Sequence, residues 1–228
     1  PRVRRQRQMC IRDRYFKTDD LKKCSRFWII LFKTILSKLY HWKIYVVGSV
    51  EYQYPNHLFQ AGYFLDKKYY DENTIDFKHL LLSEKNQSLL KDIQNSNSVG
   101  VHIRRGDYMT KQNLVIFGNI CTQKYYHDAI RIITEKVNDA VFYVFSDDIS
   151  WVQTHLDIPN AVYVNWNTGE SSIYDMYLMS SCKYNIIANS TFSYWAARLN
   201  KKTNMVIYPS KWYNTFTPDI FPESWCGI

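Results

Sequence analysis

The chain has 228 residues, of which 46% are hydrophobic and 17% aromatic, and this composition excludes a disordered tail and a fibrous repeat. Only 7 Gly and 6 Pro are present, so the chain is not a low-complexity linker. The formal net charge of +8 would suggest a nucleic-acid or membrane partner. However, residues 1–14 carry six Arg and one Asp, so the rest of the chain has 23 basic and 20 acidic residues and is nearly balanced in charge.

Residues 1–14 (PRVRRQRQMCIRDR) show no apolar periodicity and resemble the conceptual translation of a sequencing adapter. We expect them to be an artefact or a disordered basic arm, and in the first case the chain starts within a domain. The five cysteines are scattered without the spacing of a zinc site or a disulfide framework, which is typical of a reducing compartment. We therefore expect a cytoplasmic location.

The longest apolar run covers residues 27–36 (FWIILFKTIL) and is too short to span a bilayer, which needs about 20 residues. It predicts a buried helix, while the lysines around it leave open a helix on the inner face of the membrane. Residues 43–54 predict a strand, and the spacing of Leu and Ile over 75–94 predicts a helix. The polar residues 95–98 predict a domain boundary, so we assign 15–95 to a first domain.

From there the pattern becomes regular. Strands are predicted at 99–103, 140–145, 162–164, 185–188 and 205–208. Helices are predicted at 122–138, with Thr122 as the N-cap, and at 171–182, with Ser171 or Ser172 as the N-cap. A third helix is predicted from 193 to about Leu199. This alternation predicts βαβ units and a Rossmann-type parallel sheet over 96–228. Polar clusters at 104–107, 146–148 and 189–193 follow three of the strands, so we expect them to share the ligand-binding edge of the sheet.

The densest cluster is HIRRGD at 102–107. Because side chains alternate along a strand end, Arg104 and Arg105 cannot both point the same way, and one can face the crevice while the other faces the scaffold. A guanidinium is planar, bidentate and permanently charged, which suits a diphosphate. The alternative is an Arg–Asp salt bridge that ties down a turn.

The other two clusters are also ambiguous. Asp147 and Asp148 could bind a metal, read the N1–H and amino group of guanine, or cap a helix, and two neighbouring carboxylates alone are few ligands for a metal. The residues from Asn189 to Ser193 lie between a strand and a helix, where hydroxyls and backbone N–H groups can hold an anion or only cap the helix. Together at one edge, the clusters favour a shared phosphate-and-base site.

These residues carry a resemblance to a known family. HIRRGD at 102–107, FSDDISW at 145–151, DMYLMSSCKYNIIANSTFSYWAARLN at 175–200 and YPSKWY at 208–213 resemble glycosyltransferase family 11, the α-1,2-fucosyltransferases. The His-x-Arg-Arg-x-Asp motif is also similar to that of the wider α-1,2, α-1,6 and protein O-fucosyltransferase group. The Gly-rich opening segment of the family is missing from this chain.

The resemblance implies a two-lobed GT-B fold, with 15–95 on the acceptor side and 96–228 binding the donor. It implies inverting, metal-independent transfer of L-fucose from GDP-fucose to the 2-hydroxyl of a galactose-type acceptor in a surface glycan, with no cofactor. The implied diphosphate ligands are Arg104 and Arg105. The implied donor-binding residues are His102 and Asp147 or Asp148 at guanine, and Asn189, Ser190, Thr191, Phe192 and Ser193 at the phosphates.

An acceptor hydroxyl must lose its proton as the fucosyl group leaves, and Asp107, Asp175 and Glu170 are the candidate bases. Asp175 could equally be a carboxylate favoured by a helix dipole. Residues 108–121 show no clear element and are predicted to form a lid over the sugar. Two alternatives remain: a non-catalytic nucleotide- or nucleic-acid-binding protein, and an enzyme that holds a metal through Asp147 and Asp148. We expect no nucleic-acid partner.

Overall fold

The computed structural model describes residues 16–17, 45–48, 59–62 and 76–228, which fall into two compact units. In the smaller unit, β2 (Tyr45–Gly48) pairs in parallel with β3 (Phe59–Gly62), and β2 lies within the predicted strand 43–54. The larger unit contains 76–217 and 222–228, and its short strand β4 (Asp76–Phe77) pairs antiparallel with β1 (Phe16–Lys17). The leader 1–14 and the apolar run 27–36 lie outside the described residues.

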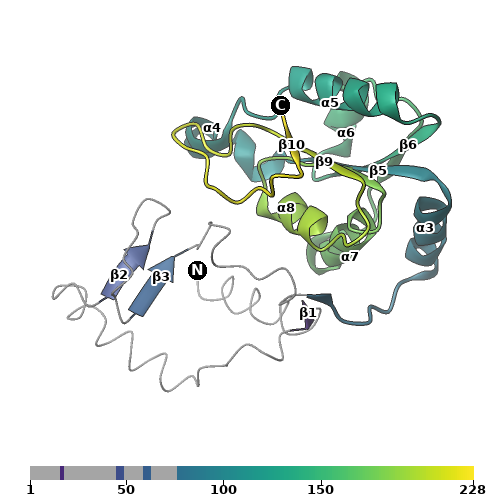
Figure 1. The fold of residues 1–228 in the computed structure, drawn as a ribbon, viewed down its shortest axis with the longest axis horizontal. Helices are drawn as coiled ribbons and strands as arrows, with labels where there is room; N and C mark the ends of the chain where they lie inside the picture. The colour runs from purple at the N-terminus through teal and green to yellow at the C-terminus, as the bar shows by residue number, and fades with distance from the viewer. Residues whose placement is uncertain (1–15, 18–44, 49–58, 63–75) are drawn as a thin grey trace. The chain divides into compact units, whose positions relative to one another are not determined.

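Six parallel strands form the sheet of the larger unit, in the order β10-β9-β8-β5-β6-β7 (Figure 1). They are β5 (Asn97–Ile103), β6 (Ala140–Ser146), β7 (Ala161–Val164), β8 (Tyr184–Ile186), β9 (Met205–Tyr208) and β10 (Cys226–Gly227). Taken from β7, this is the strand order of a Rossmann sheet, with two successive halves on either side of its first strand. The predicted α/β class and parallel sheet are confirmed, and β10 is a strand that the sequence did not predict.

Helices cover both faces of this sheet, with α5 and α6 on one side and α7 and α8 on the other (Figure 1). The α-helices of the larger unit are α3 (Glu84–Asn95), α4 (Lys111–Phe117), α5 (Gln123–Lys136), α6 (Ile149–His155), α7 (Ser172–Met179) and α8 (Thr191–Arg198). Since α3 packs against α7 and β5 within the same unit, the sheet and this helix form one body.

The core lies between the sheet and α5. Val99 and Val101 of β5 are fully buried and pack with Ile133 of α5 and Phe142 of β6. Each such side chain contributes roughly 1.5–3 kcal/mol when buried. The Thr122 hydroxyl accepts a hydrogen bond from the backbone N–H of Tyr125, so the predicted cap and buried face of this helix are confirmed.

Three predicted elements differ from the structure. The helix over 75–94 begins only at Glu84, because β4 and an irregular segment precede its Ser83 cap. Ser171 makes no capping hydrogen bond, since a 3-10 turn, η3 (Gly169–Ser171), leads directly into α7. The segment 108–121 is not without structure: it contains the second half of the 3-10 turn η2 (Gly106–Met109) and all of α4. Val115 and Ile116 of α4 are exposed, so apolar periodicity could not reveal this helix.

Candidate functional site

The predicted polar clusters meet at one edge of the sheet. Because β5, β6 and β8 are parallel, their carboxyl ends lie together, and the chain crosses from β7 on one side of β5 to β8 on the other. The topological switch point is therefore between β5 and β8, where sheets of this type bind ligands. Arg104 follows the end of β5 and Asn189 follows β8, so both stand at this point.

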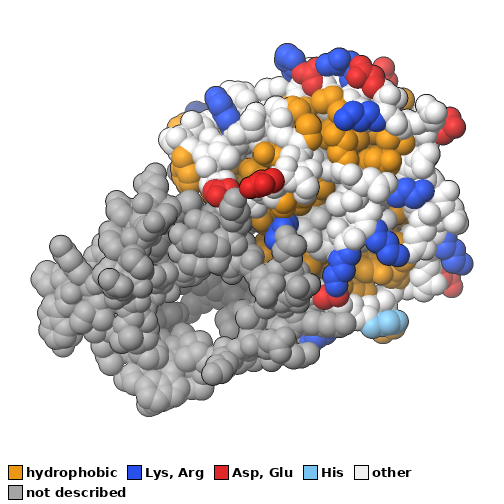
Figure 2. Space-filling view, in the orientation of Figure 1, with side chains coloured by type: hydrophobic (Ala, Val, Ile, Leu, Met, Phe, Trp, Pro, Cys, Tyr) orange, Lys and Arg blue, Asp and Glu red, His pale blue; other side chains and the backbone are white. Residues whose placement is uncertain are grey.

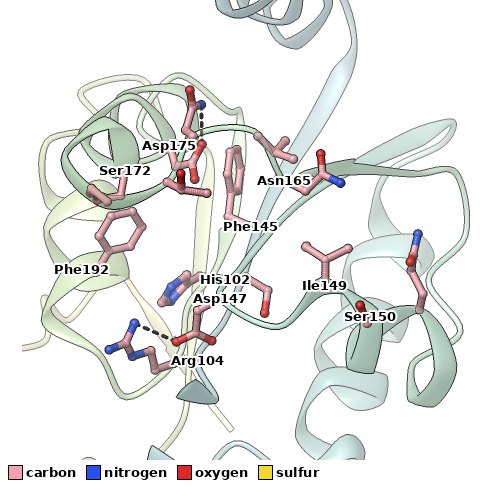
Figure 3. Close-up of a pocket in the computed structure, with 16 residues that line it drawn as sticks. His102, Arg104, Phe145, Asp147, Ile149, Ser150, Asn165, Ser172, Asp175 and Phe192 are labelled. Carbon is pink, nitrogen blue, oxygen red and sulfur yellow. Dashed lines mark hydrogen bonds and ion pairs between the residues drawn. The ribbon is translucent and has the colours of Figure 1, made fainter. Parts of the chain in front are cut away.

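A cavity of about 600 Å³ opens at this edge, and we call it the main cavity (Figure 3). The ends of β5, β6 and β7, the start of α6 and parts of α7 and α8 form its wall. Of the predicted site residues, those that line it are His102, Arg104, Asp147, Asp175 and Phe192. In Figure 3, Arg104 and Asp175 lie at opposite sides of the cavity, with His102 and Phe145 between them.

Arg104 is held by two carboxylates. Its Nη2 donates to Asp107 Oδ1 at 2.6 Å, and its Nη1 lies 2.8 Å from Asp147 Oδ2. A guanidinium has five N–H donors in one plane, so these contacts orient the group without using all its donors. The side chain is 33% exposed, and among the described residues that line the main cavity it presents the only fixed positive charge.

Arg105 contacts the start of α6. Its Nε donates to Asp148 Oδ2 at 3.2 Å, and its guanidinium lies 3.7 Å from the centroid of the Trp151 ring. Its backbone N–H donates to Asp147 Oδ1 at 2.9 Å. Arg105 does not line the main cavity, and these contacts fasten the loop after β5 to the start of α6.

Asp147 and Asp148 serve the two arginines. Asp148 also accepts a hydrogen bond from the Trp151 backbone N–H at 3.1 Å and caps α6, which was one of the predicted alternatives. Both oxygens of Asp147 are engaged, by Arg104 and by the Arg105 backbone. Only glycine leaves room for the Asp147 carboxylate at position 106, because a Cβ there would lie 2.5 Å from Asp147 Oδ2.

His102 is a buried, neutral imidazole at the cavity. Burial, and to a lesser extent the charge of Arg104, lowers its pKa from 6.5 to about 3. Its Nδ1 has no hydrogen-bond partner among the residues that the structure describes, and its ring packs at 5.0 Å from the Phe192 ring. An unpaired buried nitrogen costs about 1–3 kcal/mol, so a ligand that supplied a partner here would gain affinity.

Asp175 lies on α7 and carries a carboxyl group of unusual acidity. Burial raises its pKa to about 7, although a hydrogen bond from Asn167 Nδ2 at 2.7 Å acts in the opposite direction. Asn167 is clamped by Asn86 of α3 through two reciprocal amide bonds of 3.0 and 3.1 Å. Asn86 is 1% exposed and also accepts from Trp166 Nε1 at 2.7 Å. At neutral pH Asp175 is thus poised between its two protonation states.

The three candidate bases occupy different places. Asp175 lines the main cavity, whereas Asp107 and Glu170 do not. Asp107 belongs to η2 and touches Arg104, with 45% of its side chain exposed. Glu170 is an exposed residue of η3. The carboxyl group of Asp175 therefore lies inside the main cavity, whereas that of Asp107 lies beside Arg104.

The cluster after β8 is mainly structural. Asn189 is 2% exposed, and its Nδ2 donates to the backbone oxygens of Trp212 at 3.1 Å and Phe117 at 3.3 Å. Ser190 caps α8, Ser193 is buried with its hydroxyl on the Ala188 backbone, and Thr191 is exposed. Only Phe192 of this predicted group reaches the main cavity.

The sequence did not predict the roles of Asn167, which lines the cavity, and of Asn86, which holds it. The loop that carries Asn167 follows β7, so the strand-end rule that selected the other clusters applies to it as well. Asn86 lies on a helix before the first strand of the sheet, and no local pattern marks it.

The described surface of α5 carries charges of both signs. Figure 2 shows basic and acidic side chains interspersed there, and Lys124, Asp128, Arg131 and Glu135 pair along the helix. Among the described residues, no group of three or more His, Cys, Asp or Glu is placed to hold a metal ion. Within the same part of the chain, no helix is long and apolar enough to cross a membrane.

Comparison with known proteins places the chain in a family. The model of glycosyl transferase family 11 matches residues 21–228. An alpha-1,2-colitosyltransferase of Escherichia coli is 35% identical over 196 residues, which are 79% of this chain and 63% of that protein. The O-antigen biosynthesis glycosyltransferase WbnK of Escherichia coli is 44% identical over 122 residues, covering 53% of this chain and 40% of the relative.

A galactoside alpha-(1,2)-fucosyltransferase 2 of Pongo pygmaeus is 28% identical over 163 residues, covering 66% of this chain and 48% of that protein. The chain thus spans less than two thirds of the length of each of these relatives. The family match covers the whole six-stranded sheet and its helices, including the strand-end clusters around the main cavity. This chain belongs to glycosyl transferase family 11.

Proposed function

We propose that the protein transfers L-fucose, or a closely related sugar, from its GDP derivative to the 2-hydroxyl of a galactose-type acceptor, with inversion at the anomeric carbon. The family and the names of its relatives support a glycosyl transfer of α-1,2 type. Fucose and colitose, the sugars in those names, are both 6-deoxyhexoses. The observation that carries the proposal is Arg104 at the main cavity, oriented by two carboxylates at the switch point of a Rossmann sheet.

The donor is placed with its diphosphate at Arg104 and its nucleoside in the main cavity. Arg104 can offer its remaining N–H donors to the phosphate oxygens, and charge-assisted bonds of this kind are worth roughly 1.5–3 kcal/mol. The orphaned His102 nitrogen and the Phe192 ring line the same cavity and suit a nucleoside. No metal ion is required by this arrangement, because Asp147 and Asp148 hold the two arginines.

Asp175 reads the guanine base in this proposal. It lies across the main cavity from Arg104, where the far end of a bound nucleoside diphosphate reaches (Figure 3). A carboxylate there can accept hydrogen bonds from the N1–H and amino group of guanine, while Asn167 holds its Oδ1. Asp147 and Asp148 are less suited to this role, because their oxygens already serve Arg104, Arg105 and the start of α6.

Asp107 is the base that deprotonates the acceptor hydroxyl. It stands beside Arg104, where the departing diphosphate and the sugar meet, rather than at the nucleoside end of the cavity. As the sugar passes through an oxocarbenium-like state, Arg104 stabilises the leaving diphosphate and Asp107 takes the proton of the incoming hydroxyl. General-base catalysis of this kind typically contributes about 10²–10⁴-fold in rate.

The experiment uses the chain with GDP-fucose and a galactoside acceptor, and it compares Asp107→Asn with the parent. The product is analysed for its linkage and anomeric configuration, with chelator present throughout. We expect an α-1,2 linkage, a loss of at least about 100-fold in rate for the variant, and an affinity for GDP that is unchanged or higher, because one carboxylate no longer competes for Arg104. A folded chain that neither binds GDP nor consumes GDP-fucose would contradict the proposal.

A further inference from the structure

Tyr108 connects the arginine site to the loop after β8. It belongs to η2, and its hydroxyl donates a hydrogen bond to the backbone oxygen of Asn189 at 2.9 Å. Burial raises the pKa of Tyr108 to about 12, although the charge of Arg104 acts in the opposite direction, so the hydroxyl keeps its proton at neutral pH. Cζ of Arg104 lies 5.7 Å from the centroid of the Tyr108 ring, which is within the range of about 6 Å for cation–π attraction. The same side chain therefore contacts Arg104 with its ring and the loop after β8 with its hydroxyl.

The loop that accepts this hydrogen bond is itself held in place. Asn189 is almost fully buried, and its Nδ2 donates to the backbone oxygens of Trp212 and Phe117. Its Oδ1 accepts a hydrogen bond from Cys121 Sγ at 3.3 Å. Because both polar atoms of this side chain are engaged by other segments of the chain, the backbone oxygen of Asn189 is a fixed point for the Tyr108 hydroxyl.

The segment that follows Tyr108 is also fastened. The Tyr108 ring stacks on the Phe117 ring, with 4.6 Å between their centroids. Asn214, in the loop after β9, donates hydrogen bonds of 2.9 Å to the backbone oxygens of Val115 and Ile116. Both η2 and α4 are therefore attached to the carboxyl edge of the sheet, η2 through Tyr108 and α4 through Asn214.

We propose that Tyr108 is a positioning residue of the transfer reaction, whose hydroxyl holds η2 so that Asp107 faces the acceptor hydroxyl and Arg104 faces the diphosphate. This inference rests on the proposed function, which gives those two residues their roles. Asp107 precedes Tyr108 in the chain and pairs with Arg104 at 2.6 Å, so a shift of η2 moves both groups. Tyr108 does not line the main cavity, and it acts through these two neighbours.

The signature of this role is a loss of rate rather than a loss of binding. Tyr108→Phe removes the hydroxyl and keeps the ring, its stacking on Phe117 and its attraction to Arg104. The charge of Arg104 remains available to the diphosphate, but η2 loses its bond to Asn189. A misplacement of about 1 Å at a reacting group can cost roughly 100-fold in rate. A hydroxyl that only stabilised the fold would lower stability and leave kcat and KM unchanged.

The test measures the consumption of GDP-fucose by the full chain, with a galactoside acceptor and with water alone, together with GDP affinity and urea unfolding. Tyr108→Phe is compared with the parent, and the pair is repeated in the Asp107→Asn background to complete a double-mutant cycle. Tyr125→Phe is the matched control. The Tyr125 hydroxyl also donates to a backbone oxygen after β8, that of Ile187 at 2.6 Å, but Tyr125 packs in the core and does not line the main cavity.

We expect Tyr108→Phe to lower kcat about 10- to 100-fold, while KM for the donor and the affinity for GDP change less than about threefold. In the Asp107→Asn background the same change should cost about twofold or less, because the base that it positions is gone. Tyr125→Phe should lose stability and keep its kcat.

The inference and the proposed function fail in different ways. The inference is overturned if the kcat of Tyr108→Phe stays within about twofold of the parent, if only KM changes, or if the loss is equal in both backgrounds or in Tyr125→Phe. In each of these cases GDP binding still supports the donor site. A parent that binds GDP without consuming GDP-fucose would overturn the role of Asp107 and that of Tyr108 with it. A folded parent that neither binds GDP nor consumes GDP-fucose would overturn the proposed function as a whole.

Discussion

Asn167 donates a hydrogen bond of 2.7 Å to Asp175, and it opposes the burial that raises the pKa of this carboxyl to about 7. Ionisation of Asp175 therefore destabilises the free protein, and a ligand that supplies further hydrogen-bond donors stabilises the ionised form. The pair links the loop after β7 to α7 within the main cavity. Two consequences of pH follow from this relationship.

The first consequence concerns stability. The folded pKa of Asp175, about 7, exceeds its ordinary value of 3.8, so the folded state binds a proton that the unfolded state releases between these values. Stability is therefore lost as pH rises through this window. Asp175→Asn should be more stable than the parent by up to about 2–4 kcal/mol near pH 8, and by much less near pH 4. Urea unfolding at both pH values measures the difference, and an equal difference at both would contradict the assignment.

The second consequence concerns GDP binding. If the carboxylate form of Asp175 accepts hydrogen bonds from guanine, the affinity for GDP should rise between about pH 6 and pH 8, approaching tenfold per unit below the pKa. Binding should also release a proton, which calorimetry in buffers of different ionisation enthalpy detects. In Asp175→Asn both effects should vanish. A parent whose GDP affinity is flat across this range does not use Asp175 in this way.

Asn86 should affect the site although it lies on α3. Asn86→Ala removes both amide bonds that orient Asn167. With Asn167 less well placed, the pKa of Asp175 should rise further, and the midpoint of the GDP-binding profile should move to higher pH. Asn138→Ala is the control, since Asn138 is an exposed asparagine away from the cavity. A profile that keeps its midpoint while only stability falls would show a purely structural role.

Gly106 should tolerate no side chain. In Gly106→Ala the new Cβ would stand 2.5 Å from Asp147 Oδ2, so the carboxylate must move, and Arg104 loses one of its two partners. We expect GDP affinity to fall about tenfold while the cooperative unfolding transition is kept. Calorimetry and thermal unfolding on the same sample decide this, and unchanged affinity would show that the Asp147 contact is not needed to orient Arg104.

The sequence predicted the sheet well because its strands carry strong signals. The β5 run is β-branched and fully buried apart from its first residue, and α5 has a regular apolar face behind the Thr122 cap. Strand ends then located the clusters that contain His102, Arg104 and Asp147. These predictions needed only local patterns and the rule that parallel strands share their ligand-binding edge.

The rest depended on tertiary contacts. No local pattern says that Asp147 will hold Arg104 or that Asn86 will clamp Asn167 from 81 residues away. The different roles proposed for Asp175 and Asp107 needed the position of Asp175 across the cavity from Arg104. The helix α4 was missed because its apolar residues Val115 and Ile116 are exposed.

In the proposed function, Arg104 binds the diphosphate of a guanine nucleotide. The most direct measurement is calorimetric titration of GDP, with UDP as comparison and chelator present, into the chain, into Arg104→Ala and into Arg131→Ala. Arg131 is the matched control, because it is 63% exposed on α5 and pairs only with acidic residues of that helix. We expect GDP-selective binding that falls about 10- to 100-fold in Arg104→Ala alone. Equal GDP affinity in the parent and in Arg104→Ala would show that Arg104 does not bind the diphosphate.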